Sequence, residues 1–152
     1  MIEIIQIQLL SDNYSYIIRD KNTNITGCID PSVAKDIVNV LQNRGIDLNF
    51  ILNTHHHQDH VGGNQELKEM YNCKIIGCYD DQNRIPGIDI KLKDSEEFNI
   101  GESIFKVIDT PGHTIGHISF YFKDQNFLFC GDTIFSLGCG RLFEGSYEQM
   151  TE

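Results

Sequence analysis

No apolar run in this sequence of 152 residues approaches the length of a membrane span, and no basic cluster precedes its first apolar residues. A transmembrane helix needs about 20 consecutive apolar residues, and a secretory signal peptide begins with a positively charged segment. The sequence therefore predicts a protein with no membrane partner and no secretory signal.

Basic side chains are also scarce, since 12 Lys and Arg stand against 22 Asp and Glu and give a net charge of −10. Proteins that bind nucleic acids neutralise phosphates with clustered Lys and Arg. The charge balance therefore argues against a nucleic-acid partner. It leaves room for cations, because metal sites use carboxylates as ligands.

The five cysteines are odd in number, and none of them has the spacing of a zinc finger. Such cysteines are typical of reduced thiols in a cytoplasmic protein. The sequence shows no internal repeat, no low-complexity tract and no linker. Residues 1–152 are therefore expected to form one domain, large enough to bury a core of its own.

Short apolar stretches between turn-forming residues predict a series of strands. The expected strands are 2–10, 14–18, 25–29, 50–52, 74–77, 98–100, 104–108, 118–122 and 127–130. One helix is expected to begin after 30–32, capped by that segment, and to end at Gly45, and a second runs from about Gly62 to Tyr71. Strands that first follow one another and then alternate with helices predict a layered α/β fold.

A helix-start signal lies among the last residues. Ser146 and Gln149 have the spacing of a capping box, in which each side chain caps the backbone of the other. A helix is therefore expected to begin at Ser146, although the sequence ends at Glu152. A short, frayed turn is the alternative for this segment.

All six histidines lie in two short stretches, and each stretch follows a predicted strand. The first is Thr54-His55-His56-His57-Gln58-Asp59-His60, and the second contains His113 and His117. Asp132 follows a third predicted strand. Polar turns at the ends of neighbouring strands can converge at one edge of an α/β sheet, where ligands bind.

Four histidines and an aspartate within six residues favour a metal site over a solvated loop. Imidazole suits zinc, and a carboxylate can bridge two cations. A polyhistidine tag is the alternative interpretation, but tags do not follow a core strand in the middle of a chain. A lone His113 or Asp132 is usually a satisfied loop residue rather than a metal ligand.

The pattern His55-X-His57-X-Asp59-His60, followed by Gly62-Gly63, resembles the signature of the metallo-β-lactamase superfamily. The stretch Ser11-Asp12-Asn13-Tyr14-Ser15-Tyr16, the triple histidine and the segment Gly138–Gly145 narrow the resemblance to the hydroxyacylglutathione hydrolases, or glyoxalase II family. This resemblance implies an αββα sandwich of the metallo-β-lactamase type, incomplete at its C-terminal end.

The resemblance also implies two divalent metal ions, zinc above all, with iron or manganese as alternatives. The implied ligands are His55, His57 and His113 for one ion, Asp59 and His60 for the other, and Asp132 as a bridge between both.

His56 and His117 are not expected to be ligands, and His117 is expected to support the loop from beneath. Arg141 and Phe143 are implied along the glutathione site. Many members of the family have Lys and Tyr at these two positions. Arg141 keeps the positive charge, whereas Phe143 lacks a hydroxyl group that could form a hydrogen bond.

The implied reaction is hydrolysis of S-(2-hydroxyacyl)glutathione thioesters, such as S-D-lactoylglutathione, to glutathione and D-lactate, a step in methylglyoxal detoxification. Two adjacent cations lower the pKa of a bridging water to about 7. The resulting hydroxide is bound to the metal ions, which Asp59 and Asp132 help to hold, and it attacks the thioester carbonyl. A thiol leaving group with a pKa of about 8.5 needs no strong general acid. The sequence has no Gly-X-Ser-X-Gly elbow that would indicate a serine nucleophile.

The glyoxalase II family continues beyond the point where this sequence ends, with one more ligand histidine and a helical substrate domain. We therefore expect a weak second metal site, weak glutathione binding and a tendency to self-associate. A separate C-terminal fragment is a candidate partner.

Two other functions stay open. A persulfide dioxygenase with a single iron would use similar ligands on the same scaffold, although such enzymes usually lack the third adjacent histidine and the ending Phe143-Glu144-Gly145. The second alternative is a non-catalytic remnant that at most binds metal.

Overall fold

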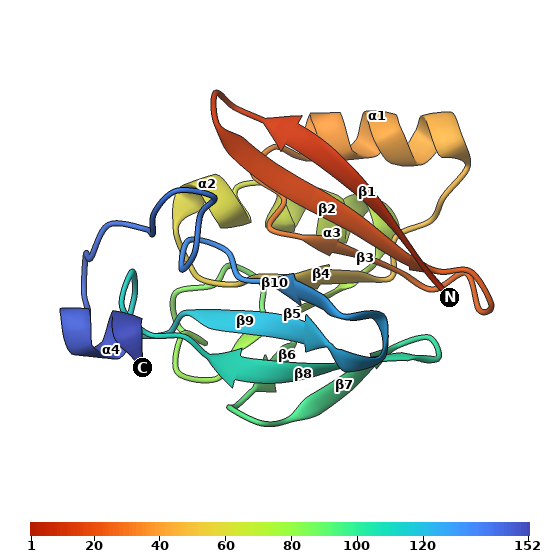
Figure 1. Ribbon diagram of the computed structural model, residues 1–152. Coiled ribbons are helices and arrows are strands. Elements are labelled where there is room, and N and C mark those ends of the chain that lie inside the picture. Colours follow the sequence, from red (N-terminus) through yellow and green to blue (C-terminus); the bar gives the residue numbers. More distant parts are fainter.

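In the computed structural model, which describes residues 1–152, two β-sheets face each other and helices cover one of them (Figure 1). The strands are β1 (Ile2–Leu9), β2 (Asn13–Asp20), β3 (Thr26–Ile29), β4 (Phe50–Leu52), β5 (Lys74–Cys78), β6 (Ile90–Leu92), β7 (Glu97–Ile100), β8 (Ser103–Asp109), β9 (Ile118–Phe122) and β10 (Phe127–Phe129). The helices are α1 (Ala34–Arg44), α2 (Gln58–Val61), α3 (Asn64–Tyr71) and α4 (Tyr147–Thr151), with a short 3-10 turn, η1, at Lys123–Gln125.

The six-stranded sheet has the order β1-β2-β3-β4-β5-β6. Strands β1 to β3 form an antiparallel meander, whereas β3 to β6 run parallel to one another. Helix α1 lies between β3 and β4 in the chain, and α2 and α3 lie between β4 and β5. Because parallel strands end at the same edge of a sheet, the segments after β3, β4 and β5 leave it on one side.

The central strands of this sheet are buried on both faces, which explains why β3, β4 and β5 are almost continuously apolar. One core, between the sheet and the helices, includes Ile17, Cys28, Ile37, Leu41, Ile51, Leu67 and Ile75. A second core, between the two sheets, includes Ile18, Ile29, Leu52, Ile76, Phe105, Phe120 and Phe122. Neighbours such as Ile17 and Ile18 thus belong to different cores, because side chains alternate between the faces of a strand.

The four-stranded sheet is an antiparallel meander with the order β10-β9-β8-β7. In β8, Phe105 and Val107 are fully buried between the sheets, whereas Ile104 on the opposite face is 41% exposed. The main helices cover only the outer face of the six-stranded sheet, and the short α4 lies beside the end of β9 (Figure 1). Residues 1–152 therefore contain three layers of the predicted αββα sandwich.

The sequence-based boundaries need correction at two helices. The helix expected from Gly62 to Tyr71 starts earlier and is divided into α2 and α3 at Gly62 and Gly63. A Cβ atom on Gly63 would lie 2.7 Å from the carbonyl oxygen of Pro31, so the chain can pass here only without a side chain. Helix α1 ends at Gly45 in a left-handed conformation, as predicted, but Val33 precedes it and no side chain caps its start.

Strand β6 is not predicted by the sequence, because only three residues pair with β5. The capping box at α4 is confirmed, since the Gln149 backbone N–H donates to Ser146 Oγ (3.3 Å) and the Ser146 N–H donates to Gln149 Oε1 (2.9 Å). None of the helices has both the length and the apolar character that crossing a bilayer requires.

The buried carboxylate of Asp20 joins the turn after β2 to the turn before β8. Its Oδ1 accepts a hydrogen bond from the backbone N–H of Asn22 (2.8 Å), and its Oδ2 accepts from the N–H of Glu102 (2.9 Å) and from Ser103 Oγ (3.0 Å). Burial favours a higher pKa for Asp20, but these hydrogen bonds outweigh it and hold the pKa below the usual value. Asp20 thus fixes the two sheets relative to each other at the end opposite the histidines.

Replacement of Asp20 by Asn should lower the free energy of unfolding at pH 7 by about 1–3 kcal/mol, the usual size of hydrogen bonds to a charged group. A depressed folded-state pKa stabilises the protein above the unfolded value of about 3.9, and this contribution is lost as the pH falls through the folded pKa. Urea unfolding of both proteins should therefore show a smaller difference at pH 3 than at pH 7. The exposed Lys35→Gln on α1 serves as a control, and a loss that is equal at both pH values would contradict the assignment.

Candidate metal centre

Three segments bring histidine and carboxylate side chains together at the edge where β4, β8 and β10 end. His55 and His57 follow β4, His60 lies in α2, His113 lies in the loop between β8 and β9, and Asp132 follows β10. The ring centres of His55 and His113 are 4.9 Å apart, and those of His57 and His113 are 4.7 Å apart. The convergence predicted from the sequence is therefore present.

The carboxylate of Asp132 lies between the imidazoles of His60 and His113. Its Oδ1 is 3.3 Å from His60 Nε2, and its Oδ2 is 3.4 Å from His113 Nε2. On the other side, His113 Nε2 is 3.0 Å from His57 Nδ1. A carboxylate with one oxygen toward each imidazole has the arrangement that a bridging ligand needs.

Two groups of side chains have ligand atoms that all lie within 4.8 Å of one another. The first is His55, His57 and His113, and the second is His55, His60 and Asp132. Asp59 belongs to neither group. Its side chain is 47% exposed, and its Oδ2 lies 3.5 Å from His60 Nε2 and accepts a hydrogen bond from Asn13 Nδ2 (2.9 Å). The structure thus places Asp59 beside the cluster but nearer to solvent than the other ligand candidates.

The buried imidazoles leave nitrogen atoms free toward the centre of the cluster, which is the property that a metal ion requires. His55 Nε2 is buried without a hydrogen-bond partner, and the nearest acceptor atoms to the buried His60 Nε2 are the carboxylate oxygens of Asp132 (3.3 Å) and Asp59 (3.5 Å). The opposite nitrogens are held, that of His55 by Thr54 Oγ1 (3.0 Å) and that of His60 by Asp30 Oδ2 (3.0 Å). Partners of this kind fix the orientation of metal-binding histidines, so these residues fit a divalent cation.

His117 lies beneath the cluster and belongs to neither ligand group. Its ring stacks on His55 with centres 4.9 Å apart, and its Nε2 accepts a hydrogen bond from the backbone N–H of Asp132 (3.2 Å). The Nδ1 atom lies 2.8 Å from Thr110 Oγ1. Burial and the neighbouring His113 lower the pKa of His117 to about 3, which keeps the ring neutral and able to accept this bond. His117 therefore supports the loop that carries Asp132.

A glycine allows the segment after β10 to come this close. Gly131 has a φ of +48°, which favours glycine, and a Cβ atom there would lie 2.5 Å from Thr54 Oγ1 and 2.7 Å from His117 Nε2. A side chain at this position would push the segment away from the loop after β4. Packing therefore requires a glycine directly before Asp132.

Charge and burial divide the histidines into two kinds. Burial, followed by the neighbouring imidazoles, lowers the pKa of His55 far below its usual value and lowers that of His57 as well. Burial also favours a lower pKa for His60, but the carboxylates of Asp132 and Asp30 outweigh it and raise this pKa to about 10. At neutral pH the metal-free cluster therefore holds a proton on His60 and none on His55.

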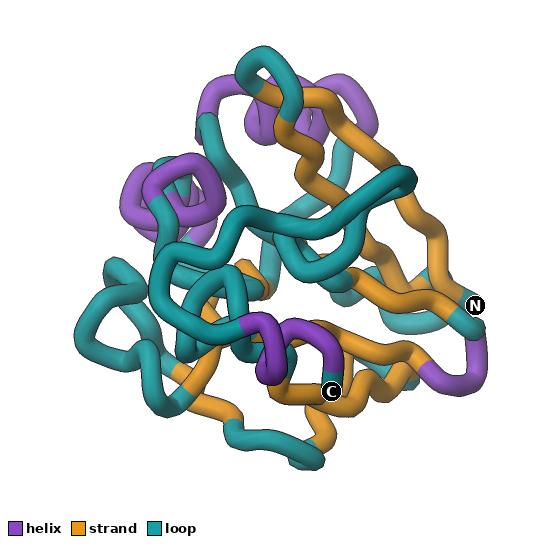
Figure 2. Tube along the Cα trace, turned by 60° about the vertical axis from the view of Figure 1, so that its left-hand side comes forward, coloured by secondary structure: helices purple, strands orange, loops and turns teal.

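A groove of about 1310 Å³ opens in front of the cluster and is lined by His60, His113, Asp59 and Asp132. Further along, its lining includes Tyr14, Tyr16, Ile134, Leu137, Arg141 and Phe143. The ring of Phe143 meets those of His57 and His113 edge-on, with both centres at 5.3 Å. The segment that carries Arg141 and Phe143 runs as a loop across the front of the molecule before α4 (Figure 2). The groove thus joins the candidate metal ligands to an apolar wall that carries the cationic side chain of Arg141.

Sequence reasoning missed the side chains that hold the ligands from behind. Asp30 is buried, accepts hydrogen bonds from the Thr54 N–H (2.8 Å) and from Thr54 Oγ1, and holds His60. Its position directly after β3, at the edge where β4 also ends, is a signal that could have identified it. Asn13, which holds Asp59, lies in the stretch Ser11–Tyr16 that supports the family resemblance, but the sequence did not indicate this contact.

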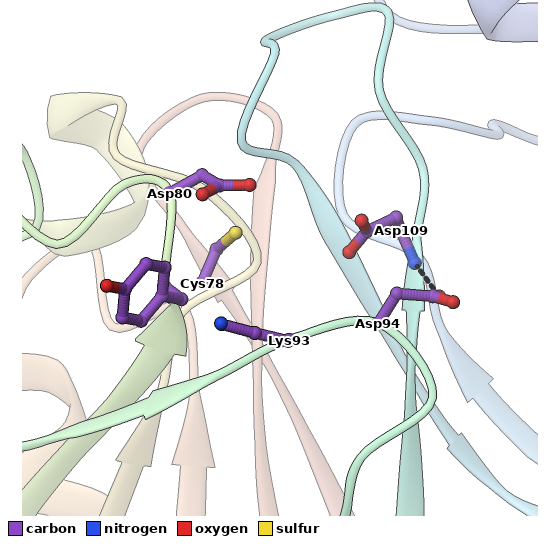
Figure 3. A pocket seen from close by; sticks show the side chains of 6 residues that line it. Cys78, Asp80, Lys93, Asp94 and Asp109 are labelled. Atoms are coloured by element: carbon purple, nitrogen blue, oxygen red, sulfur yellow. Dashed lines mark hydrogen bonds between the residues drawn. The ribbon is translucent and has the colours of Figure 1, made fainter.

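Figure 3 shows a second, smaller hollow of about 330 Å³, lined by Cys78, Tyr79, Asp80, Lys93, Asp94 and Asp109. It contains no histidine, and none of its residues belongs to a ligand group. Its charges are partly paired with near neighbours, since Asp94 Oδ1 accepts from the Asp109 N–H (2.9 Å) and Lys93 Nζ lies 4.4 Å from the ring centre of Tyr79. The histidine cluster is therefore the candidate metal centre.

Two facing sheets with histidine and carboxylate ligands on the loops of one edge define a class of metal-dependent proteins. The chain belongs to the metallo-β-lactamase superfamily, whose sequence profile matches residues 11–151. Membership of this superfamily implies divalent metal binding, and the two ligand groups are consistent with it.

Comparison with individual proteins narrows the relationship. The chain is 53% identical over 150 residues to a hydroxyacylglutathione hydrolase of Methylococcus capsulatus, with 99% of this chain and 59% of that protein covered. Among solved structures, it is similar to ETHE1 from Myxococcus xanthus, with a TM-score of 0.85, 28% identity, and coverage of 97% of this chain and 66% of that one. A B3 metallo-β-lactamase, BLEG-1, has the same fold, with a TM-score of 0.86, 24% identity, and coverage of 99% and 81%. The chain spans about six tenths of the length of the curated relatives it matches.

Metal binding should release a proton from His60, because this residue carries one at pH 7 and a metal ligand must be unprotonated. The affinity of the group that contains His60 should therefore rise by about tenfold per pH unit below a pH of about 10, as expected when one proton is displaced. Calorimetric titration with zinc in buffers of different ionisation enthalpy measures the protons released. The same titration shows whether a second ion binds more weakly than the first. Uptake of zinc without proton release at pH 7 would contradict the assignment.

Proposed function

We propose that the chain holds divalent ions at the histidine cluster and hydrolyses glutathione thioesters in the adjoining groove. The observation that carries this proposal is the pair of buried imidazole nitrogens, on His55 and His60, that point without partners into a cluster shared with Asp132. Because the opposite nitrogen of each ring is already held by Thr54 or Asp30, these two nitrogens are positioned to bind a metal ion.

The proposed ligands of the first ion are His55, His57 and His113, whose nitrogens form one compact group. Asp59 and His60 are proposed for a second ion, with Asp132 between the two. Asp59 lies at the exposed rim and Asn13 holds it, so only a small movement of its side chain is needed. Zinc suits a site dominated by imidazole, and iron and manganese also accept mixed nitrogen and oxygen ligands.

A bound divalent ion lowers the pKa of water to about 7 and polarises a carbonyl oxygen, which is the chemistry that thioester hydrolysis needs. The protein's own residues do the rest. Asp132 and Asp59 supply the negative charge on either side of the reaction centre. The rings of Phe143 and His57 meet edge-on and narrow the groove around it. Because the leaving thiol has a pKa of about 8.5, no side chain has to act as a strong general acid.

The glutathione part of the substrate is negatively charged, and Arg141 supplies a cation in the lining of the groove. The central carbon of its guanidinium group lies 5.7 Å from the ring centre of Phe143, and the planar fork of N–H donors in such a group matches the geometry of a carboxylate. The similarity to proteins named hydroxyacylglutathione hydrolase supports a thioester of this class, such as S-D-lactoylglutathione. The chain covers only part of those relatives, and the segment that they have beyond this match is proposed to contribute to their glutathione binding.

Hydrolysis of S-D-lactoylglutathione by the purified, zinc-loaded chain tests this function, with thiol release followed in time. His55→Ala and Asp132→Asn should each reduce kcat/KM by at least about a hundredfold. Loss of a residue that only supports a metal ligand costs about 10- to 100-fold, and loss of a ligand itself should cost more. Addition of the C-terminal segment that a relative has beyond the matched residues should raise the rate further. The exposed Lys35→Gln on α1 should leave it unchanged. Equal rates for Asp132→Asn and wild type would exclude the proposed site.

The choice of substrate class is tested separately at Arg141. Arg141→Ala should raise KM for the glutathione thioester by about tenfold, a typical cost of about 1.4 kcal/mol for one charged contact. Arg141→Lys keeps the charge and should recover most of the affinity. Neither change should alter kcat or the rate with a small thioester that lacks the glutathione carboxylates. Glutathione persulfide with iron-loaded protein, assayed for oxygen uptake, separates the alternative dioxygenase function from thioester hydrolysis.

A further inference from the structure

Four charged or ionisable side chains that belong to neither metal group form one connected cluster behind the histidines. They are His56, Asp81, Arg84 and Glu144, which we call the clamp. His56 lies between the proposed ligands His55 and His57. The other three come from the segment after β5 and from the loop before α4.

Asp81 is the centre of the clamp and is completely buried. Its Oδ2 is 2.9 Å from His56 Nδ1, and its Oδ1 accepts hydrogen bonds from Arg84 Nε (2.9 Å) and Arg84 Nη2. Because an ionised carboxylate can only accept, Nδ1 of His56 is the donor. The segment after β5 is thereby joined to the loop that carries His55 and His57.

Arg84 extends the cluster to Glu144, which follows the groove residue Phe143 in the chain. Its Nη1 donates to Glu144 Oε1 (2.5 Å), and its Nη2 is 3.2 Å from Glu144 Oε2. Glu144 Oε2 also accepts from the backbone N–H of Ile115 (2.9 Å), in the loop that carries His113. Hydrogen bonding to Arg84, followed by that to Ile115, holds the pKa of Glu144 below its usual value. Arg84 thus links two carboxylates. Asp81 contacts the loop that carries His55 and His57, and Glu144 contacts the loop that carries His113.

These segments approach so closely that small shifts would be transmitted between them. A Cβ atom on Gly116 would lie 2.3 Å from Asp81 Oδ1, and one on Gly145 would lie 2.6 Å from the Cα atom of Gly112. The backbone N–H of Phe143 donates to the carbonyl oxygen of His113 (3.1 Å). The loop that carries His113 therefore lies between Asp81 on one side and the segment Phe143–Gly145 on the other.

The geometry points to the clamp as a positioning device that sets how tightly the first ligand group, His55, His57 and His113, holds its metal ion. None of the four residues touches the ion or the substrate in this assignment. They fix the relative positions of the two loops that deliver the three imidazoles. The inference rests on the metal site proposed above, but not on any hydrolytic activity.

Arg84 is the residue on which the clamp depends. A guanidinium group has five N–H donors in a planar fork and can bridge two carboxylates, whereas the ammonium group of lysine acts as a single point. Loss of Arg84 would leave the buried Asp81 with only His56 as a side-chain partner, and would leave Glu144 with the Ile115 N–H (2.9 Å) and His56 Nε2 (3.6 Å). Breaking one partner of a buried ion pair is costlier than removing an exposed one, so the loops should move to relieve the charge.

The test measures zinc affinity of the metal-free full chain by competition with a chromophoric chelator. Arg84→Met should weaken zinc binding by about tenfold, the lower end of the effect that supporting residues have on metal sites. Arg84→Lys should give an intermediate loss. Glu144→Gln, which keeps the shape and an acceptor oxygen, should give a smaller loss of the same sign.

Lys68→Met is the matched control. Lys68 Nζ donates to Asp89 Oδ1 (2.7 Å) and to the carbonyl oxygen of Gly87 (2.7 Å), so it also joins a helix to a loop by an ion pair. Its exposure, at 30% of the side chain, is close to the 38% of Arg84. Lys68→Met should lower the Tm of the metal-free protein without a change in zinc affinity.

The combined results decide the matter. Weaker zinc binding in Arg84→Met but not in Lys68→Met supports the clamp, whereas a zinc affinity within about twofold of wild type in Arg84→Met overturns it, whatever happens to Tm. If Arg84→Met fails to fold by circular dichroism, Glu144→Gln decides by the same criterion. A wild-type chain that binds no zinc overturns the metal site itself, a result that is visible before any variant is made.

Discussion

The site depends on the way one buried carboxylate, that of Asp30, is satisfied. It accepts hydrogen bonds from the Thr54 backbone and hydroxyl groups and from His60, and so connects the end of β3 to the loop after β4 and to α2. Thr54 Oγ1 in turn lies beside His55 Nδ1. A buried carboxylate is costly unless all its neighbours donate to it. Its burial therefore fixes the orientation of two imidazoles before any cation is present.

Five histidine rings crowd together around this point, and the electrostatics of the site follow from that crowding. Burial and mutual repulsion keep His55 and His117 neutral, whereas two carboxylates keep a proton on His60. One of these two carboxylates, that of Asp132, also belongs to a candidate ligand group, so a proton on His60 and a metal ion would compete for the same position.

The sequence predicted the parts of the fold and site that depend on local pattern. Apolar runs predicted nine of the ten strands, and the family resemblance implied a ligand set that includes every residue of the two groups that could hold an ion. Long-range contacts were not accessible in this way. Asp81 and Arg84 look like ordinary residues of a polar turn, and only the fold brings them to His56 and Glu144. The division between α2 and α3 also arises from tertiary contact, because Gly63 passes the backbone of Pro31.

Asp132 is delivered by β10, a strand of three residues at the border of the four-stranded sheet, where it pairs only with β9. A border strand of this length opens more readily than the strands beside it, and local opening requires less free energy than unfolding of the whole domain. A cation bound through Asp132 would oppose such opening, because a ligand stabilises the conformation that binds it. Amide hydrogen exchange in Phe127–Phe129 would therefore slow when metal binds. The exchange rate of this strand would thus indicate whether the metal centre is occupied.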